Sequence, residues 1–156
     1  MYKILFVCRG NICRSPMAEY IFADMLKKRR LGGISVQSAA TSTEEIGSPV
    51  HSGTAGILRR LGIDFSAKRA RQMTSSDADS FDLLVGMDSA NIRNMARIAG
   101  EKNSGKIHRL LDFSDRPRDI SDPWYTGDFE ATYRDVCEGC EGLLERLGKE
   151  GRFEDA

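Results

Sequence analysis

Cys8 and Arg14 bring a nucleophile and an anion-binding group into one short segment of this chain, which reads VCRGNICRSP over 7–16. A loop of this length can curl so that successive backbone N–H groups point inward, and a following helix start adds partial positive charge. Such a cradle binds an oxyanion and favours the thiolate form of Cys8, which is the nucleophilic form. The planar guanidinium of Arg14 can hold two phosphoryl oxygens as charge shifts during reaction. The spacing therefore indicates nucleophilic chemistry at phosphate.

The whole loop is expected to surround the phosphate. The predicted phosphate-binding residues are Arg9, Gly10, Asn11, Ile12, Cys13, Arg14 and Ser15. Ser15 can also donate a hydrogen bond to the sulfur. A Walker nucleotide site is excluded because its Gly-Lys pair is missing. In a purely structural reading, Cys8 would be a small buried apolar residue and Arg14 a solvated side chain at a helix start.

The elements that must position this loop alternate between strands and helices. The predicted strands are 2–7, 34–39, 82–87 and 107–111. The predicted helices are 16–30, 50–61, 89–99 and 129–147. The helical segments repeat apolar residues every three or four positions, whereas the strand segments are short apolar runs. This order predicts an α/β fold, a single-domain doubly wound sheet of four parallel strands with helices on both faces, over residues 1–156.

Parallel sheets bind ligands at the carboxyl ends of their strands, where two predicted loops would meet. One is the loop after the first strand. The other is the longest irregular stretch, 112–127, which follows the fourth strand and contains Asp112, Asp115, Asp119 and Asp122. An alkoxide or aryloxide leaves poorly from phosphorus, so the reaction needs a general acid on the side opposite the sulfur. The residue types alone leave all four aspartates as candidates.

Composition narrows the function classes. Lys and Arg total 23, as do Asp and Glu, which argues against a dedicated nucleic-acid binder. The apolar run 4–7 is too short for a secretory signal or a membrane span, so a cytoplasmic protein with reduced cysteines and no membrane partner is expected. Cys137 and Cys140 lie on the apolar stripe of the last helix, so no metal site is predicted. We expect a monomer without a cofactor.

The segment VCRGNICRSPMAE, residues 7–19, resembles the signature of the low-molecular-weight protein tyrosine phosphatases, and the resemblance continues through most of the chain. It implies that Cys8 forms a phosphocysteine intermediate and that Arg14 holds the phosphoryl group. It also implies that a serine, Ser38, joins Asn11 and Ser15 in a network that shapes the loop. Asp88, in the similar segment Met87-Asp88-Ser89-Ala90-Asn91, is given a structural role near the site.

The resemblance also selects the general acid. Asp122-Pro123-Trp124-Tyr125 is similar to the family's acid loop, which implies that Asp122 is the acid and that Trp124 and Tyr125 wall a slot for a phenyl ring. Four positions depart from the family pattern. Glu44 stands where an aromatic wall residue is usual, Arg9 replaces an apolar residue, and His51 and Lys68 replace an aspartate and a histidine. These changes bear on substrate preference more than on chemistry.

The resulting hypothesis is a cysteine-dependent phosphatase that acts on tyrosine-phosphorylated proteins. The resemblance also implies that Cys13 can form a reversible disulfide with Cys8. A protein arginine phosphatase is the nearest alternative, but such relatives tend to carry threonine at the position of Ile12, and the bulkier residue favours a phenyl phosphate. An arsenate reductase would need resolving cysteines, which are missing between Cys13 and Cys137. A phosphoprotein-binding module is the last alternative, in which Cys8 and Asp122 would serve no joint purpose.

Overall fold

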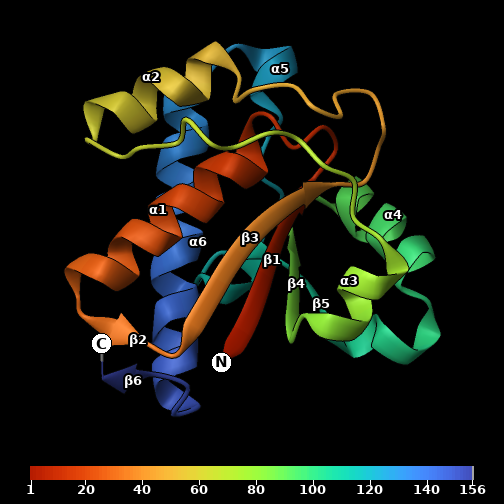
Figure 1. Cartoon of the computed structure of the whole chain (residues 1–156), viewed down its shortest axis with the longest axis vertical. Helices are drawn as coiled ribbons and strands as arrows, with labels where there is room; N and C mark the ends of the chain where they lie inside the picture. Colours follow the sequence, from red (N-terminus) through yellow and green to blue (C-terminus); the bar gives the residue numbers. More distant parts are fainter. Residues whose placement is uncertain (156) are drawn as a thin grey trace.

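The computed structural model describes residues 1–155, and Cys8 ends the first strand of its central sheet (Figure 1). The strands are β1 (Tyr2–Cys8), β2 (Leu31–Gly32), β3 (Ile34–Ala40), β4 (Leu83–Gly86), β5 (Ile107–Arg109) and β6 (Glu154–Asp155). The α-helices are α1 (Arg14–Lys28), α2 (Ser52–Arg60), α3 (Ser75–Ser80), α4 (Ser89–Ala99), α5 (Pro123–Thr126) and α6 (Phe129–Lys149). Two 3₁₀ helices complete the described elements, η1 (Glu101–Lys106) and η2 (Leu110–Phe113).

The order of the strands places the first loop at a natural binding position. The central sheet has the order β3-β1-β4-β5, and every pairing in it is parallel. The chain therefore leaves β1 toward β3 on one side and later returns to β4 on the other side. Ligands of doubly wound sheets bind at this switch point, outside the carboxyl end of the strands. The segment after Cys8 lies there.

Two apolar layers cover the two faces of the sheet. Ile4, Phe6 and Val85 point into the core beneath α1, α2 and α6, whereas Leu5 and Leu84 pack into the core beneath α3 and α4. Figure 1 shows these two groups of helices on opposite sides of the sheet. The alternation along β1 arises because successive side chains of a strand point to opposite faces. The predicted fold class, with four parallel strands and helices on both faces, is confirmed.

Several element limits differ from the predictions because local patterns do not fix them. α1 begins at Arg14, two residues before the predicted start at Pro16, so the last loop residues belong to the helix. The fourth strand ends at Arg109 because the chain turns into η2. The stretch 112–127 is also less irregular than expected, since it holds the end of η2 and all of α5. α3 and the antiparallel pair β2-β6 were not predicted, because short segments carry little periodicity.

The long helix α6 fixes the start of the second loop. Gly139 and Gly142 face η2, and a Cβ atom at either position would overlap Leu110 or the backbone at Phe113. The two glycines therefore allow a close approach between helix and loop that any larger residue would block. α6 is amphipathic, with Leu143 and Leu147 in the core and charged residues outside. Among residues 1–155, no helix is both long and apolar enough to cross a membrane.

Candidate active site

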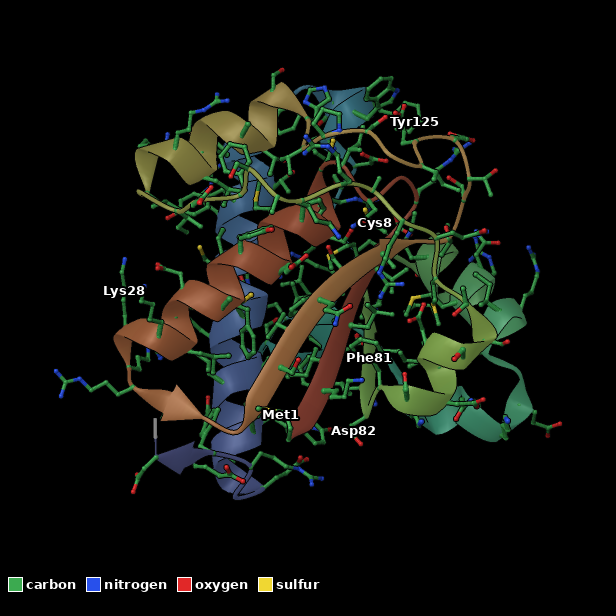
Figure 2. The ribbon with its side chains drawn as sticks, viewed as in Figure 1. Met1, Cys8, Lys28, Phe81, Asp82 and Tyr125 are labelled. Atoms are coloured by element: carbon green, nitrogen blue, oxygen red, sulfur yellow. The ribbon has the colours of Figure 1, made fainter. Side chains whose placement is uncertain are left out.

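The loop after β1 is held in a tight curl by hydrogen bonds from neighbouring segments. Figure 2 shows where this loop starts, at Cys8. Asn11 has a φ of 58°, in the left-handed region that few non-glycine residues adopt. The backbone N–H of His51 donates to the carbonyl of Ile12 at 2.9 Å. The hydroxyl of Thr54, from α2, donates to the carbonyl of Cys13 at 3.0 Å. These two contacts tie the outer side of the curl to the start of α2.

A buried network on Asn11 sets this conformation. The Asn11 side-chain amide donates to the hydroxyls of Ser15, at 2.8 Å, and Ser38, at 2.9 Å. Its carbonyl oxygen accepts from the backbone N–H of Arg71 at 3.2 Å. Asn11, Ser15 and Ser38 are each 1% exposed or less. The structure therefore brings together the three supporting residues that the sequence proposed, and it anchors them to the segment around Arg71.

Cys8 lies at the floor of the curl beside the start of α1. Its sulfur is 3.0 Å from the Ser15 hydroxyl and 3.4 Å from the Ser15 backbone N–H, which donates to it. The side chain is 3% exposed, yet it lines an open pocket. Free N–H groups at a helix start and a neighbouring hydroxyl stabilise negative charge on such a sulfur.

Glu19 and Lys68 extend the network away from the pocket. The Ser38 hydroxyl donates to Glu19, and the Lys68 ammonium donates to the Ser38 carbonyl at 2.9 Å. Burial raises the pKa of Glu19 and lowers the pKa of Lys68, although the two groups lie only 3.7 Å apart. The cost of desolvating both charges therefore outweighs their attraction. Glu19 had no role in the sequence-based prediction, because only the fold places α1 beside β3.

Arg14 is an arginine with almost no contact with solvent. It is 2% exposed, and its Nη1 donates to Asp88 Oδ2 at 2.6 Å and to the carbonyl of Ile120 at 2.8 Å. Its Nη2 donates to Asp122 Oδ2 at 3.3 Å. Burial by itself lowers the pKa of Arg14, but Cys8, Asp88 and Asp122 raise it above the ordinary value. Arg14 therefore stays charged and fixed in direction, with Asp88 as its structural partner.

Of the four aspartates in the second loop, the structure places only Asp122 in the pocket with Cys8. Asp112 pairs with Arg109, and Asp119 pairs with Arg109 and Ser89. Asp115 is exposed and does not line this pocket. Asp122 caps α5, since its Oδ1 accepts from the Trp124 backbone N–H at 3.1 Å. The geometry agrees with the resemblance on which aspartate is suited to be the acid.

A salt-bridge cluster ties the second loop to α6. Arg118 donates to Glu138 at 2.9 Å and to Asp135 at 2.9 Å, and Arg116 donates to Glu138 at 3.0 Å. Hydrogen bonding to Arg118 lowers the pKa of Glu138 to about 2. The backbone N–H of Ile120 donates to the Met87 carbonyl at 2.9 Å, next to β4. These contacts hold the loop on both sides just before Asp122.

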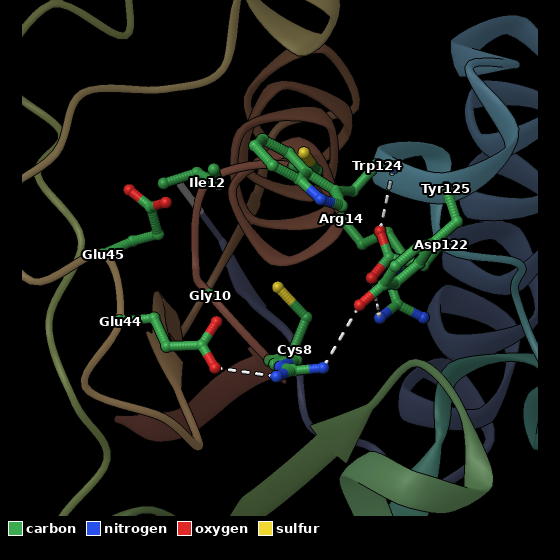
Figure 3. A pocket seen from close by; sticks show the side chains of 11 residues that line it. Cys8, Gly10, Ile12, Arg14, Glu44, Glu45, Asp122, Trp124 and Tyr125 are labelled. Carbon is green, nitrogen blue, oxygen red and sulfur yellow. Dashed lines mark hydrogen bonds and ion pairs between the residues drawn. The ribbon is translucent and has the colours of Figure 1, made fainter.

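The pocket above Cys8 is small, and its walls are partly charged and partly apolar (Figure 3). It encloses about 110 Å³. Its lining consists of Cys8, Arg9, Gly10, Ile12, Cys13, Arg14, Glu44, Glu45, Asp122, Trp124 and Tyr125. Figure 3 shows the Cys8 sulfur pointing into the space between Ile12 on one side and Trp124 and Tyr125 on the other. The apolar walls leave room for a flat ring above the sulfur.

The rim of the pocket is polar at Glu44, the position where an aromatic residue is usual in the family. Arg9 Nη2 donates to Glu44 Oε1 at 2.7 Å, and Arg9 Nη1 donates to the Tyr125 hydroxyl at 3.3 Å. The two departures from the family pattern, Arg9 and Glu44, are therefore partners in one ion pair. Tyr125 is 71% exposed, and its hydroxyl is tied to the rim by this contact with Arg9.

Two further residues at the rim were not predicted to have a role. Glu45 lines the pocket beside Glu44 and accepts from the Ser48 hydroxyl at 2.9 Å. His51 stacks on Phe129, with ring centroids 5.0 Å apart, and meets the edge of Trp124 at 5.7 Å. His51 thus supports the exposed Trp124 ring. The sequence showed His51 only as a departure, because these three aromatic groups are far apart along the chain.

Known proteins are similar to this chain in sequence and in fold. The sequence model of the low molecular weight phosphotyrosine protein phosphatases matches residues 3–153. The low molecular weight protein-tyrosine-phosphatase YfkJ of Bacillus subtilis is 47% identical over 96% of this chain and 98% of its own length. The YfkJ crystal structure superposes with a TM-score of 0.92 and covers 96% of both chains. A phosphatase structure from Streptococcus pyogenes, 40% identical, covers 94% of this chain and 93% of its own with a TM-score of 0.84. This chain belongs to the low molecular weight phosphotyrosine protein phosphatase family.

Proposed function

We propose that this chain hydrolyses phosphotyrosine in proteins with Cys8 as nucleophile, Arg14 as phosphate ligand and Asp122 as general acid. Membership of the family makes the chain a protein tyrosine phosphatase, a hydrolase that works through a cysteine. The observation that carries the residue roles is the pocket itself, because it holds Cys8, Arg14 and Asp122 beneath a slot walled by Trp124 and Tyr125.

In the first step the Cys8 thiolate attacks phosphorus and the bond from phosphorus to the phenolic oxygen breaks. Arg14 and the loop N–H groups bind the equatorial phosphoryl oxygens throughout. Asp122 donates its proton to the leaving phenolic oxygen, which departs as tyrosine. The enzyme then carries a phosphocysteine on Cys8 and a carboxylate on Asp122.

In the second step a water molecule attacks the phosphocysteine. Asp122, now ionised, accepts a proton from that water while the bond from sulfur to phosphorus breaks. Inorganic phosphate leaves, Cys8 returns to the thiolate, and Asp122 is again protonated. One carboxylate therefore serves as acid and then as base, which requires its fixed position at the start of α5.

The walls of the slot explain a preference for phosphotyrosine. A phenyl ring reaches from the rim to the loop and is held between Ile12 and the exposed aromatic pair Trp124 and Tyr125. Phosphoserine is several bonds shorter, so its peptide backbone meets the rim before its phosphate reaches the sulfur. Ile12, bulkier than the threonine of arginine phosphatases, also makes the slot less polar.

Side-by-side hydrolysis of phosphotyrosine, phosphoserine and phosphoarginine peptides in the presence of a chelator tests this substrate choice. We expect phosphotyrosine to be turned over at least about 10²-fold faster than either other substrate, because burial of the ring contributes several kcal/mol. The measurement is kcat/KM from released phosphate. Faster turnover of phosphoarginine would transfer the chain to the arginine phosphatases, and no turnover of any peptide would contradict a phosphatase.

The arsenate reductase alternative needs resolving cysteines that can reach Cys8, and Cys137 and Cys140 are not placed for this role. Cys140 is fully buried on α6, and Cys137 is half-buried on the same helix within the core cluster. Neither residue lines the pocket that contains Cys8. Thiols packed in this way cannot reach a product bound on the loop without unfolding the helix. Hydrolysis of a phosphate ester therefore remains the proposed function.

We also propose that Cys13 protects Cys8 during oxidation. Both residues line the same pocket, and burial raises the pKa of Cys13 to about 12, so Cys13 is a thiol while Cys8 reacts. Peroxide would oxidise Cys8 to a sulfenic acid, and condensation with the Cys13 thiol would release water and form a disulfide. After peroxide and then thiol reductant, the wild type should regain activity, whereas Cys13→Ser should not. Equal recovery in both, with no mass loss of two hydrogens, would contradict this role.

The cytoplasmic location and the monomeric state stay predictions. Size-exclusion chromatography with light scattering measures the oligomeric state directly.

A further inference from the structure

A second, larger groove borders the catalytic pocket on its α4 side. It encloses about 650 Å³, in the range of sites that hold small ligands or short peptide segments. Its outer wall is formed by Ala90, Asn94, Arg97 and Ile98 of α4. The catalytic pocket and the groove share Arg9, Arg14, Glu44, Asp122 and Tyr125, so the two cavities lie side by side.

The difference in volume indicates that the two cavities hold different parts of a protein substrate, the phosphorylated side chain in the pocket and the flanking polypeptide in the groove. The pocket above Cys8, at about 110 Å³, takes only the phosphorylated side chain. The polypeptide on either side of that residue must then lie outside the pocket, across its rim. Where it crosses the contact between Arg9 and Tyr125, it enters the groove, which offers a continuous depression with polar side chains.

The charges of the groove are paired except at one position. Arg14 is paired with Asp88 and Asp122, and Arg9 is paired with Glu44. Within residues 1–155, Arg97 forms no ion pair, and its Nη1 donates only to Asn94 Oδ1 at 2.7 Å. That contact keeps the guanidinium on the groove side of α4. The groove holds three arginines and three carboxylates and is neutral as a whole, but Arg97 is the arginine of its lining that no carboxylate contacts within residues 1–155.

The remaining polar groups of the groove suit a peptide. Thr41 carries a hydroxyl that can donate to or accept from a peptide backbone, and Asn94 offers an amide, whereas the Ser42 hydroxyl already donates to the Arg9 carbonyl at 2.8 Å. Ile98 adds a small apolar surface. A groove with backbone-binding groups and one free guanidinium recognises an extended segment that carries a carboxylate.

We propose that this groove binds the segment next to the phosphotyrosine and that Arg97 pairs with an acidic side chain there, so the enzyme prefers phosphotyrosine with Asp or Glu nearby. The proposal rests on the proposed phosphotyrosine activity of the neighbouring pocket. Arg97 is a specificity-determining residue in this arrangement, because it contacts the substrate at a distance from the reacting phosphate. The pairing occurs at an exposed surface, so its effect is modest and sensitive to salt.

The test compares phosphotyrosine peptides that differ only by Glu or Gln, placed at each of the three positions before and after the phosphotyrosine. The readout is the ratio of kcat/KM for each Glu peptide to its Gln partner, measured at low and at high salt. In the wild type we expect a ratio of about five at one or more positions, falling toward one as salt rises. In Arg97→Glu the same ratio should fall below one.

Arg93→Glu is the matched control. Arg93 lies one turn earlier on α4, is exposed, and lines a separate cavity beside β5. The two variants change the net charge and the helix by the same substitution, so a general loss of helix stability would slow Glu and Gln peptides alike. Arg93→Glu should retain the wild-type ratio.

Three results would overturn the proposal: a wild-type ratio near one at all positions, an unchanged ratio in Arg97→Glu, or an equal change in Arg93→Glu. Phenyl phosphate, which has no flanking segment, separates this failure from failure of the proposed function. If the wild type hydrolyses phenyl phosphate but shows no preference among the peptides, only the groove assignment is wrong. If it hydrolyses neither phenyl phosphate nor the peptides, the proposed phosphatase chemistry is wrong as well.

Discussion

Cys8→Ser is expected to abolish turnover of phosphotyrosine, with a loss of kcat of at least about 10⁴-fold, while binding of phosphate is retained. A serine hydroxyl is not ionised near neutral pH, and the Ser15 hydroxyl beside it at 3.0 Å is a hydrogen-bond partner rather than a general base. The loop N–H groups and Arg14 are unchanged by the substitution. Removal of the thiolate charge also removes a repulsion toward the phosphate dianion, so affinity should stay the same or increase.

The measurements for Cys8→Ser are initial rates with a phosphotyrosine peptide and calorimetric titration with the same peptide. Cys137→Ser is the control, since it makes the same replacement on α6 outside the pocket. It should keep the wild-type rate. A Cys8→Ser protein that still turns over substrate at a measurable fraction of the wild-type rate would remove Cys8 from the mechanism. Loss of both rate and binding, with intact folding, would instead point to a structural role.

Asp122→Asn is expected to reduce kcat by about 10²- to 10⁴-fold for phenyl phosphate and much less for p-nitrophenyl phosphate. Phenolate is the poorer leaving group of the two, so it depends more on a proton from the enzyme. Asparagine is as good a helix cap as aspartate, which preserves the contact from the Trp124 N–H to the position of Oδ1. The loop should therefore keep its shape while the acid is lost.

Two comparisons separate chemistry from structure at Asp122. Asp119→Asn makes the same change three residues earlier, at a side chain that binds Ser89 and Arg109 outside the catalytic pocket, and should leave the leaving-group dependence unchanged. Asp122→Ala removes acid and cap together, so it should also destabilise the loop by about 1 kcal/mol. An Asp122→Asn enzyme that loses equal activity with both leaving groups would exclude protonation of the leaving group by Asp122.

The catalytic loop could be predicted because its chemistry is local. Cys8, Arg14 and the helix start lie within one continuous segment, and the curl between them needs only backbone geometry and the dipole of α1. The strand and helix order was equally accessible, since buried strands and amphipathic helices have different periods. The role of Asp122 was harder to predict from the residues alone. Its choice over three neighbouring aspartates came from resemblance, and the fold supports it through the cap on α5 and the contact with Arg14.

Other parts of the site depend on contacts between distant segments. The ion pair between Arg9 and Glu44 joins residues 35 positions apart, and the contact between Arg9 and Tyr125 joins residues 116 positions apart. No local sequence pattern around Arg9 identifies Glu44 or Tyr125 as its partner. The same is true of Gly139, whose function becomes visible only where α6 approaches Leu110.

The sequence by itself determined the alternating α/β architecture and brought the proposed nucleophile and the proposed anion-binding loop into one segment, because short-range spacing and side-chain periodicity encode them. The tertiary structure decided which side chains share the rim, which carboxylates neutralise Arg14, and that the guanidinium of Arg97 lies without an ionic partner in a groove beside the pocket. These features depend on how parallel strands bring separate loops to one edge of the sheet. Pairwise distances between such loops arise only when the core has packed.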